Sequence, residues 1–378
     1  MKKYIPITEM LWFQEGPGVR NTQYTTSGVK LLNVANLVEG ELDITNTDRY
    51  ISTDEAYGRY KHFLVDAGDF IIASSGIKVE YFDRKMGFAK KEQLPLCMNT
   101  STIRFKVLNK DQLSIRYFMY YLKSDHFKEQ LNHQITGSAQ LNFGPSHLKK
   151  MVFPIVEMSI QNQITEKLDT LYNIESRMRK EIELLDELVK SRFIELFGDP
   201  VSNSRGLPEN TLPEMGEFGR GVSKHRPRND AKLLGGKHPL IQTGDVAAAD
   251  LYITEYNSTY SDLGLAQSKM WKKGTLCITI AANIAKTAIL DFDACFPDSV
   301  VGFIANEKTN NVYIHYWFSF FQRILEAQAP ESAQKNINLK ILSELKVICP
   351  DKDEQDAFAA FVAQVDKSKH FSELEVAA

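Results

Sequence analysis

Apolar residues between positions 160 and 196 recur every three or four residues. They are Ile160, Ile164, Leu168, Leu171, Ile174, Met178, Ile182, Leu185, Val189, Phe193 and Leu196. The average spacing of about 3.5 residues is typical of a coiled-coil seam. It predicts one helix that ends at the Phe-Gly-Asp-Pro segment 197–200, because glycine favours a left-handed cap and proline cannot continue a helix. A helix of about 38 residues is roughly 57 Å long, and such a helix needs a packing partner.

The rest of the pattern occurs twice. Ser-Ala-Gln-Leu-Asn at 138–142 recurs as Ser-Ala-Gln-Lys-Asn at 332–336, and the segments before each copy follow the same order. Short apolar runs predict strands and aromatic-rich stretches predict helices. The expected strands are 29–37, 63–73 and 99–105 in the first copy and 239–246, 270–280 and 298–303 in the second, and the expected helices are 114–134 and 311–328. A shared order of this kind indicates a duplicated module.

A second apolar helix is expected near the C-terminus, where 353–371 carries Phe358, Phe361, Val362, Val365 and Phe371 in helical register. Each long helix follows an equivalent module, so an antiparallel pair would place the modules at opposite ends of a rod. The second helix is shorter than the first, which leaves part of the first seam without cover. Either the helix pair is a short one, or another subunit covers the exposed seam, in which case we expect a partner subunit to contact Ile182, Leu185, Val189 and Phe193.

These patterns predict an α+β fold with two similar domains, each a mixed β-sheet with flanking helices, joined by long spacer helices that form an antiparallel coiled coil. The predicted boundaries are 1–158 for the first domain, 159–199 for the central spacer helix, 200–352 for the second domain and 353–378 for the C-terminal spacer helix.

The composition is that of an ordinary globular protein, with 378 residues, 43% hydrophobic and 25% charged. The N-terminus has no signal-peptide pattern, and no apolar run approaches the ~20 residues that span a bilayer. These features predict a cytoplasmic protein without a membrane partner. The four cysteines lack a C-x-x-C spacing, so we expect buried, inert thiols rather than a zinc site.

The charge balance argues against a protein that coats nucleic acid without sequence preference. There are 45 basic and 48 acidic residues, a net charge of -3, whereas nonspecific binding depends on many Lys and Arg that neutralise phosphates. Basic residues are nevertheless concentrated locally in the segment 220–238, where Asp230 is the only acid. A local DNA contact therefore remains compatible with the composition.

Catalytic motifs are missing from the sequence. It contains no Gly-rich phosphate loop of either common type, no H-E-x-x-H and no G-x-S-x-G. The eight histidines are scattered, without metal-ligand spacing. The sequence predicts a non-catalytic protein with no cofactor and no metal of its own, although an active site assembled from distant residues stays open.

Polar loops at corresponding places of the two modules are the main binding candidates. Arg pairs with guanine O6 and N7, Asn and Gln pair with adenine, and Lys, Ser and Thr suit phosphates. The loops 16–23 and 219–228 supply these residue types, and each loop taken alone could equally be a solvated turn. The candidate DNA-binding residues there are Arg20, Asn21, Gln23, Lys224, His225, Arg226 and Arg228.

Further candidates rank lower because capping or turn formation explains them about as well as DNA contact. They are Lys30, Asn33, Asn36, Ser74, Ser75, Lys78, Gln242, Thr243, Asn283 and Lys286. Gln140 and Asn142 recur as Gln334 and Asn336 in the second module. Residues shared by both modules are expected to serve structure or phosphate contact rather than base recognition.

The combination resembles the specificity subunit of type I restriction-modification systems. The resemblance covers essentially the whole chain and depends on the paired S-A-Q-x-N segments, the Phe-Gly-Asp-Pro end of the first spacer and the apolar-proline segments that lead to Gln161 and Gln355. It implies two target recognition domains that each recognise half of a bipartite site in double-stranded DNA, with the coiled coil fixing the gap between the halves.

The same resemblance implies the partners and where the cofactors bind. Two modification (methyltransferase) subunits would bind S-adenosylmethionine and dock on the spacer helices, and restriction subunits would use ATP and Mg. Two alternatives stay open: a specificity subunit of a methylation-only or phage-defence complex, and a protein scaffold that does not recognise DNA. The sequence does not give the target bases.

Overall fold

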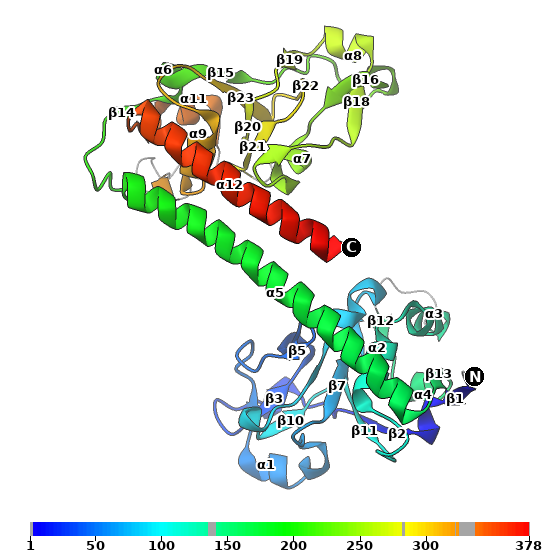
Figure 1. The fold of residues 1–378 in the computed structure, drawn as a ribbon. Helices are drawn as coiled ribbons and strands as arrows, with labels where there is room; N and C mark the ends of the chain where they lie inside the picture. The colour runs from blue at the N-terminus through cyan, green and yellow to red at the C-terminus, as the bar shows by residue number, and fades with distance from the viewer. Residues whose placement is uncertain (1–2, 135–140, 282–283, 322, 325–336, 378) are drawn as a thin grey trace. The chain divides into compact units, whose positions relative to one another are not determined.

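The computed structural model describes residues 3–134, 141–281, 284–321, 323–324 and 337–377. Within it the chain divides into two compact units, unit 1 (Met1–Ile174) and unit 2 (Glu175–Ala378) (Figure 1). The long helix α5 (Met158–Phe197) belongs to both units.

Unit 1 is built on a four-stranded antiparallel sheet with the order β2-β11-β7-β9 and a three-stranded sheet with the order β10-β3-β6. The strands are β2 (Leu11–Glu15), β11 (Thr102–Val107), β7 (Phe70–Ala73), β9 (Met86–Phe88), β10 (Leu96–Met98), β3 (Val29–Leu32) and β6 (Tyr50–Ile51). Two-stranded pairs join β1 (Lys3–Pro6) to β13 (Val152–Ile155), β4 (Leu37–Val38) to β5 (Glu41–Leu42) and β8 (Ser75–Ile77) to β12 (Leu141–Asn142). The α-helices are α1 (Thr53–Tyr57), α2 (Ile115–Leu122), α3 (Asp125–Gln134), α4 (Pro145–Leu148) and the first part of α5.

Unit 2 repeats this plan with a five-stranded sheet, β15-β23-β20-β21-β17, and a four-stranded sheet, β18-β16-β22-β19. The strands are β15 (Gly216–Arg220), β23 (Val300–Ala305), β20 (Leu276–Thr279), β21 (Thr287–Leu290), β17 (Tyr252–Ile253), β18 (Ser258–Tyr260), β16 (Leu234–Leu240), β22 (Ala294–Cys295) and β19 (Met270–Trp271), with β14 (Glu209–Asn210) paired to β24 (Val347–Ile348). The α-helices are α6 (Leu212–Met215), α7 (Thr243–Ala248), α8 (Asp262–Ala266), α9 (Asn311–Phe318), α11 (Leu339–Glu344) and α12 (Lys352–Ala377), with the last part of α5.

The register of the strands matches between the units, which confirms the duplication inferred from the sequence. In each main sheet the strand before the aromatic helix pairs with the first long strand on one side and with the buried apolar strand on the other. Cys97 and Cys295 are buried at the same place, each beside a leucine of a parallel strand, Leu31 and Leu240. Burial raises the pKa of the Cys97 thiol to about 12 and also raises that of Cys295, so both thiols stay protonated at neutral pH.

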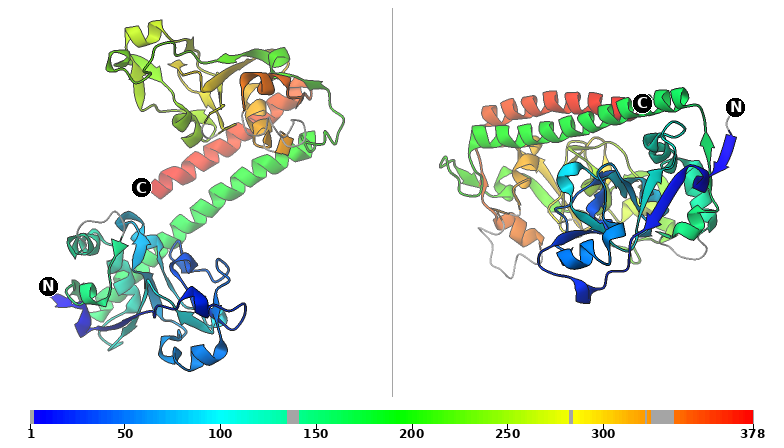
Figure 2. Two further views of the ribbon diagram at one scale, coloured as in Figure 1. Left: turned by 180° about the vertical axis from the view of Figure 1, so that it is seen from behind. Right: turned by 90° about the horizontal axis from the view of Figure 1, so that it is seen from below.

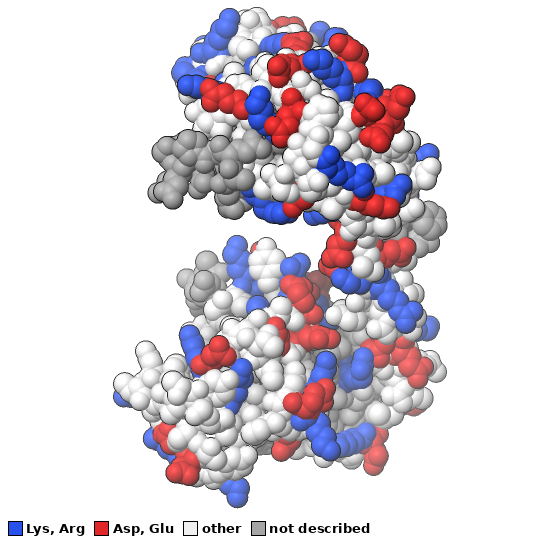
Figure 3. Space-filling view, turned by 90° about the vertical axis from the view of Figure 1, so that its left-hand side faces the viewer, with Lys and Arg blue, Asp and Glu red and all other residues white. Residues whose placement is uncertain are grey.

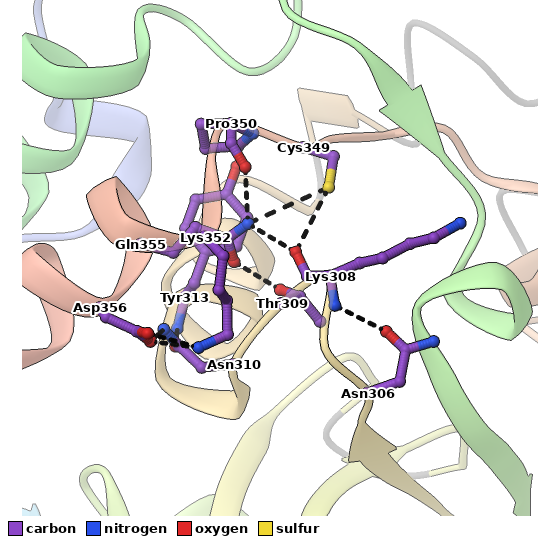
Figure 4. Close-up of polar contacts among 10 residues, drawn as sticks. All are labelled: Asn306, Lys308, Thr309, Asn310, Tyr313, Cys349, Pro350, Lys352, Gln355 and Asp356. Atoms are coloured by element: carbon purple, nitrogen blue, oxygen red, sulfur yellow. Dashed lines mark hydrogen bonds and ion pairs between the residues drawn. The ribbon is translucent and has the colours of Figure 1, made fainter.

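A buried glutamine fixes the start of each long helix. The Gln161 side-chain amide donates to the carbonyl oxygens of Gln112 and Val156, both at 2.8 Å. Figure 4 shows the matching residue, Gln355, whose amide donates to Lys308 O at 3.0 Å and Pro350 O at 2.8 Å. Both glutamines have no exposed surface. The apolar-proline-glutamine segments of the sequence are therefore equivalent joints between a sheet and its helix.

Helix α5 ends at Phe197, and Gly198 follows with a φ of 76°. This is the left-handed cap that the sequence predicted. Within unit 2, α12 lies antiparallel to the last part of α5 (Figure 2). Phe193 and Phe197 both meet the Phe358 ring, with centroids 5.6 and 5.7 Å apart. Farther along, the Lys369 ammonium binds the Asp186 carboxylate. The predicted antiparallel pairing is present over this length.

This pairing corrects one expectation. Val189 and Phe193, expected to contact a partner subunit, are 1% and 0% exposed and belong to the core of unit 2. Leu185 packs against the same core, and Ile182 is half-buried. Their own chain covers these positions: the Phe193 ring, for example, packs against Tyr313, Phe320 and Phe358.

Several expected elements differ in detail. The expected helix 311–328 breaks after Phe318, strand 63–73 is regular only at Phe70–Ala73, and strand 270–280 is divided into Met270–Trp271 and Leu276–Thr279. The predicted helix 114–134 is broken into α2 and α3 at residues 123 and 124. Of the expected strand 29–37, only Val29–Leu32 is regular strand before a short 3-10 turn. In unit 2 the expected strand 239–246 turns into helix α7, because the Asp245 carboxylate accepts the backbone N–H of Gln242 at 2.8 Å and caps the first turn.

Candidate nucleic-acid interface

One edge of the main sheet in unit 1 brings together three of the polar segments. The loop after β2 begins at Gly16, whose N–H donates to Thr102 O at 2.9 Å. A Cβ atom at Gly16 would lie 2.0 Å from Asn99 O, so only glycine fits against this turn. Asn99 then accepts the Val19 N–H through its side chain at 3.2 Å. The loop 16–23 is thus held against the turn 99–101.

The matching edge of unit 2 uses the same device. Gly221 donates to Val300 O at 2.8 Å, and its Cβ would lie 2.3 Å from Phe296 O. Gly16 therefore corresponds to Gly221, two residues beyond the Gly219 start that the sequence comparison suggested. The loop that follows Gly221 is the basic segment, which we call the basic loop (residues 224–228).

The small-residue loops lie at the same edge. Ser74 N–H donates to Ser101 O at 2.8 Å in unit 1, and Ile280 N–H donates to Ser299 O at 3.0 Å in unit 2. In unit 1 strand β12 adds Asn142 beside Ser75, which is the end of the first S-A-Q-x-N segment. We define the recognition edge as 16–23, 74–78 and 99–101 in unit 1 and as 221–230, 280–281 and 297–299 in unit 2.

Several candidate side chains are exposed at or beside these edges. Arg20, Asn21, Lys78, Lys224 and Lys286 are all exposed. No hydrogen bond ties the side chain of any of these five to another described residue. Thr243 is half-buried at the start of α7, and Gln242 is exposed. Asn283 and Gln140, with Gln334 and Asn336, lie outside the described residues.

Other candidates are used by their own unit. The Gln23 amide donates to Glu55 Oε1 at 2.8 Å, and the Lys30 ammonium donates to Ile44 O at 2.7 Å with 16% of its side chain exposed. Ser74 is 1% exposed, and Ser75 Oγ donates to Ser101 Oγ. These side chains hold loops in place, which is the capping and turn role that the sequence left open.

Asn36 and Asn33 give the clearest correction. Asn36 is 1% exposed and donates to Asp43 O at 2.9 Å, so this side chain does not reach a ligand. Its Oδ1 accepts the Asn33 N–H at 2.9 Å, in the same way that Asp245 accepts that of Gln242. Both pairs are caps that belong to the shared frame.

The sequence reasoning missed Asn99, the residue that organises the edge of unit 1. It is 2% exposed, donates to Asn33 Oδ1 at 2.9 Å and accepts from Val19. The adjacent Ser101 has a φ of 65°. The polar Asn-Thr-Ser-Thr run ahead of a strand was the available signal, since it is the composition of a tight turn.

The basic loop of unit 2 is ion-paired. Arg226 Nη2 lies 3.5 Å from Asp298 Oδ2, and Arg228 binds the other carboxylate oxygen. His225 Nε2 lies 3.1 Å from Asp230 Oδ2. The Lys232 backbone N–H and then His225 hold the pKa of Asp230 below its usual value. Four candidate residues thus lie on one exposed loop, and three of them are positioned by carboxylates or carbonyl groups of unit 2.

In unit 1 a carboxylate, that of Glu15, ends strand β2 directly before the recognition edge. Burial raises the pKa of Glu15, which accepts a hydrogen bond from Ser74 Oγ at 3.5 Å. The two edges therefore share backbone geometry and differ in charge. On the face drawn in Figure 3, Lys and Arg lie interspersed with Asp and Glu, as the near-neutral composition leads one to expect.

The described residues contain no group of three His, Cys, Asp or Glu side chains that could hold a metal ion. Over the same ranges, none of the helices is long and apolar enough to cross a membrane.

Most of the chain matches a known protein family. The family model for the type I restriction modification DNA specificity domain matches the chain twice, at residues 20–184 and 209–375. The two matches span most of the chain and fall one on each repeat. The chain therefore belongs to this family of DNA specificity subunits, and the resemblance drawn from the sequence is confirmed.

The chain is also similar to specificity subunits of type I restriction enzymes. A chain assigned as the specificity subunit of type I restriction enzyme MjaX from Methanocaldococcus jannaschii is 22% identical over 351 residues, which cover 90% of this chain and 80% of the relative. The MjaVIII specificity subunit of the same organism is 22% identical over 190 residues, covering 49% of this chain and 43% of the relative.

Solved structures support the same fold. The type I restriction-modification S subunit from M. genitalium matches with a TM-score of 0.59 at 15% identity, covering 100% of this chain and 92% of that chain. A chain from a structure on complex assembly and conformational transition of the type I restriction-modification system matches with a TM-score of 0.51 at 14% identity, covering 100% and 94%.

Proposed function

We propose that this chain is the DNA-recognition subunit of a type I restriction-modification complex, in which each recognition edge contacts one half of a bipartite target in double-stranded DNA. The observation that carries the proposal is the pair of equivalent edges with different side chains. A shared frame fixes where the loops lie, and differing loops suit different half-sites, since base recognition depends on the side chains that reach the grooves.

The chain itself binds and positions in this proposal, and partners supply the chemistry. Two modification subunits would carry S-adenosylmethionine and methylate adenine flipped out of the duplex, and restriction subunits would carry ATP and Mg. The complex would act in the cytoplasm. The family membership is the main support for this division of labour.

The docking surface for the modification subunits is assigned to exposed apolar residues of α5. Because Val189 and Phe193 are buried, the exposed set replaces them in this role. These side chains are 43 to 62% exposed and comprise Ile160, Leu171, Tyr172, Ile174, Leu184 and Leu188. Exposed apolar side chains repeated along one helix favour a protein partner. Replacing Leu184 and Leu188 with Ser should weaken co-purification of the modification subunit without unfolding unit 2, and unchanged co-purification would contradict the assignment.

The direct test of the function is the genomic methylation pattern in cells with and without this chain. The proposal predicts a bipartite adenine-methylated motif that disappears when the chain is deleted and returns when it is restored. A pattern that is the same in both cells would contradict it. Gel-shift titration of the chain with its methyltransferase partner against random DNA pools separates DNA recognition from a scaffold role, since a scaffold would select no sequence.

A further inference from the structure

Asp298 has an unusual position in the recognition edge of unit 2. It lies in the turn 297–299 directly before strand β23, and 32% of its side chain is exposed. Its two carboxylate oxygens are divided between two guanidinium groups: Oδ2 faces Arg226 and Oδ1 faces Arg228. A single carboxylate thus joins both arginines of the basic loop to the frame of the unit.

Arg226 is held from a second side. Its Nη1 donates to Ser223 O at 2.5 Å and to His225 O at 2.9 Å, while Nη2 faces Asp298 at 3.5 Å. Three acceptors around one planar group leave it little rotational freedom. Arg228 uses only Nη2 for Asp298, and its Nη1 and Nε have no hydrogen-bond partner among the described residues. Both side chains remain about half exposed, at 55% and 45%.

Stability does not account for this arrangement. Ion pairs between exposed side chains contribute roughly 0–1 kcal/mol, because water screens them and two flexible side chains must be ordered. What the carboxylate does provide is direction. A guanidinium group that is fixed through some of its N–H donors keeps the remaining donors in a defined orientation, and an oriented guanidinium is what pairs bidentately with guanine O6 and N7. A freely rotating arginine instead binds the phosphate backbone at many positions.

The comparison with unit 1 shows that this device belongs to the loops and not to the frame. The residue equivalent to Asp298, by strand register, is Thr100. Loop 16–23 of unit 1 contains only one arginine, Arg20, which is exposed and makes no ion pair with the described residues. The carboxylate and its two arginines are therefore found together in one unit and absent together from the other.

We propose that Asp298 is a positioning residue that orients Arg226 and Arg228 for guanine in the half-site contacted by unit 2. The inference depends on the proposed function, since it concerns how one edge selects bases. It assigns a role in sequence selection to Asp298, although a carboxylate has the opposite charge to the Lys and Arg side chains that bind DNA. Its carboxylate opposes binding to phosphates in general and favours binding to the correct base.

The test uses the full chain assembled with its modification subunits and selects duplexes from a random DNA pool. The variants are D298A, D298N and the charge control D291A, which removes the exposed carboxylate paired with Lys273 away from the edge. For D298A we expect the ratio of affinities for selected over random duplex to fall at least tenfold. Affinity for random duplex should stay equal or rise a few-fold, because a negative charge is removed. D298N retains one acceptor oxygen and should recover part of the ratio, whereas D291A should keep the wild-type ratio.

The other half-site serves as an internal control. Guanine preference should weaken at positions of a single half-site in the D298A selection, with the second half-site as in the wild type. An unchanged ratio in D298A, a ratio that falls equally in D291A, or a loss spread over both half-sites would overturn the role of Asp298. If the wild-type complex selects no sequence, the proposed function itself fails, which distinguishes the two failures. Circular dichroism melting of each variant checks that unit 2 is folded.

Discussion

Equivalent positions in the two main sheets carry a charged side chain in unit 1 and a glycine in unit 2. Arg104 in β11 and Gly302 in β23 occupy equivalent register positions. In unit 1 the Arg104 guanidinium pairs with Asp69 at 3.2 Å, with both side chains 5 to 6% exposed. In unit 2 the Trp271 ring covers Gly302, where a Cβ atom would lie 2.6 Å from the ring, and it stacks on Phe296 with centroids 5.1 Å apart.

This difference teaches which parts of the module are fixed. The layer above the sheet accepts either an ion pair or an aromatic stack, provided that the space is filled. By contrast the glycine at the start of the recognition loop, the glutamine joint and the buried cysteine occur in both units. The retained features place the loops, so differences in recognition can arise from loop side chains alone.

Arg104→Ala should cause the largest difference in stability between the two units. The substitution removes the closer of the two cations that pair with the buried Asp69 carboxylate, leaving Lys106 at 3.4 Å, and it also removes hydrogen bonds to Leu64 O, His62 O and the Gln14 side chain. Breaking a buried pair by removal of one member costs about 3–5 kcal/mol. Hydrogen exchange followed by mass spectrometry should show loss of protection in unit 1 and none in unit 2. Arg84→Ala, which removes an ion pair between two exposed side chains of unit 1, Arg84 and Glu39, is the matched control and should cost below about 1 kcal/mol.

The glutamine joints should give the next largest effect, and an equal one in both units. Gln161→Ala and Gln355→Ala each remove two hydrogen bonds that the side-chain amide donates and one that its oxygen accepts, from Ser114 N–H or Thr309 Oγ1, for about 2–4 kcal/mol in total. Each variant should lower the protection of its own unit. The exposed neighbours Gln163 and Gln364 supply matched controls, whose Ala variants should change stability by at most about 0.5 kcal/mol. A large effect in one unit and none in the other would show that the joints are not equivalent.

A lower pH should destabilise unit 2 relative to unit 1, by a smaller amount than the substitutions above. His315 in α9 corresponds to Met119 in α2 by helix position. Burial lowers the pKa of His315 to about 4, with Asp250 and Lys369 acting in opposite directions. The unfolded chain, with a histidine pKa near 6.5, binds the proton more readily than the folded chain does. The stability that the neutral His315 side chain contributes to unit 2 is therefore present above pH 6.5 and is lost as the pH falls towards 4.

The expected loss for unit 2 is on the order of 1–2 kcal/mol between pH 7 and pH 5. Urea unfolding followed by tryptophan fluorescence measures it, because Trp271 and Trp317 are buried in unit 2. His315→Met, which copies unit 1, should remove most of this pH dependence. A variant that keeps the full dependence would assign it to other groups.

The sequence predicts features that depend on local chemistry. The spacer helix, its cap at Gly198 and the duplicated strand order follow from periodicity and turn residues, and the structure confirms them. The partial exposure of Cys349, the helical turn at Thr243 and the burial of Asn36 were not predicted, since each depends on contacts with segments distant in the chain. The pairing of Arg226 and Arg228 with Asp298 joins residues about 70 positions apart, and no sequence spacing signals it.

The most direct test of the central claim, that two equivalent edges each select one half-site, is methylation mapping of loop variants. Cells would carry Arg20→Ala with Asn21→Ala in unit 1, or Arg226→Ala with Arg228→Ala in unit 2. The account predicts that each pair changes or relaxes one half of the methylated motif and leaves the other half as in the wild type. Variants that alter both halves together, or that leave both halves intact, would contradict it.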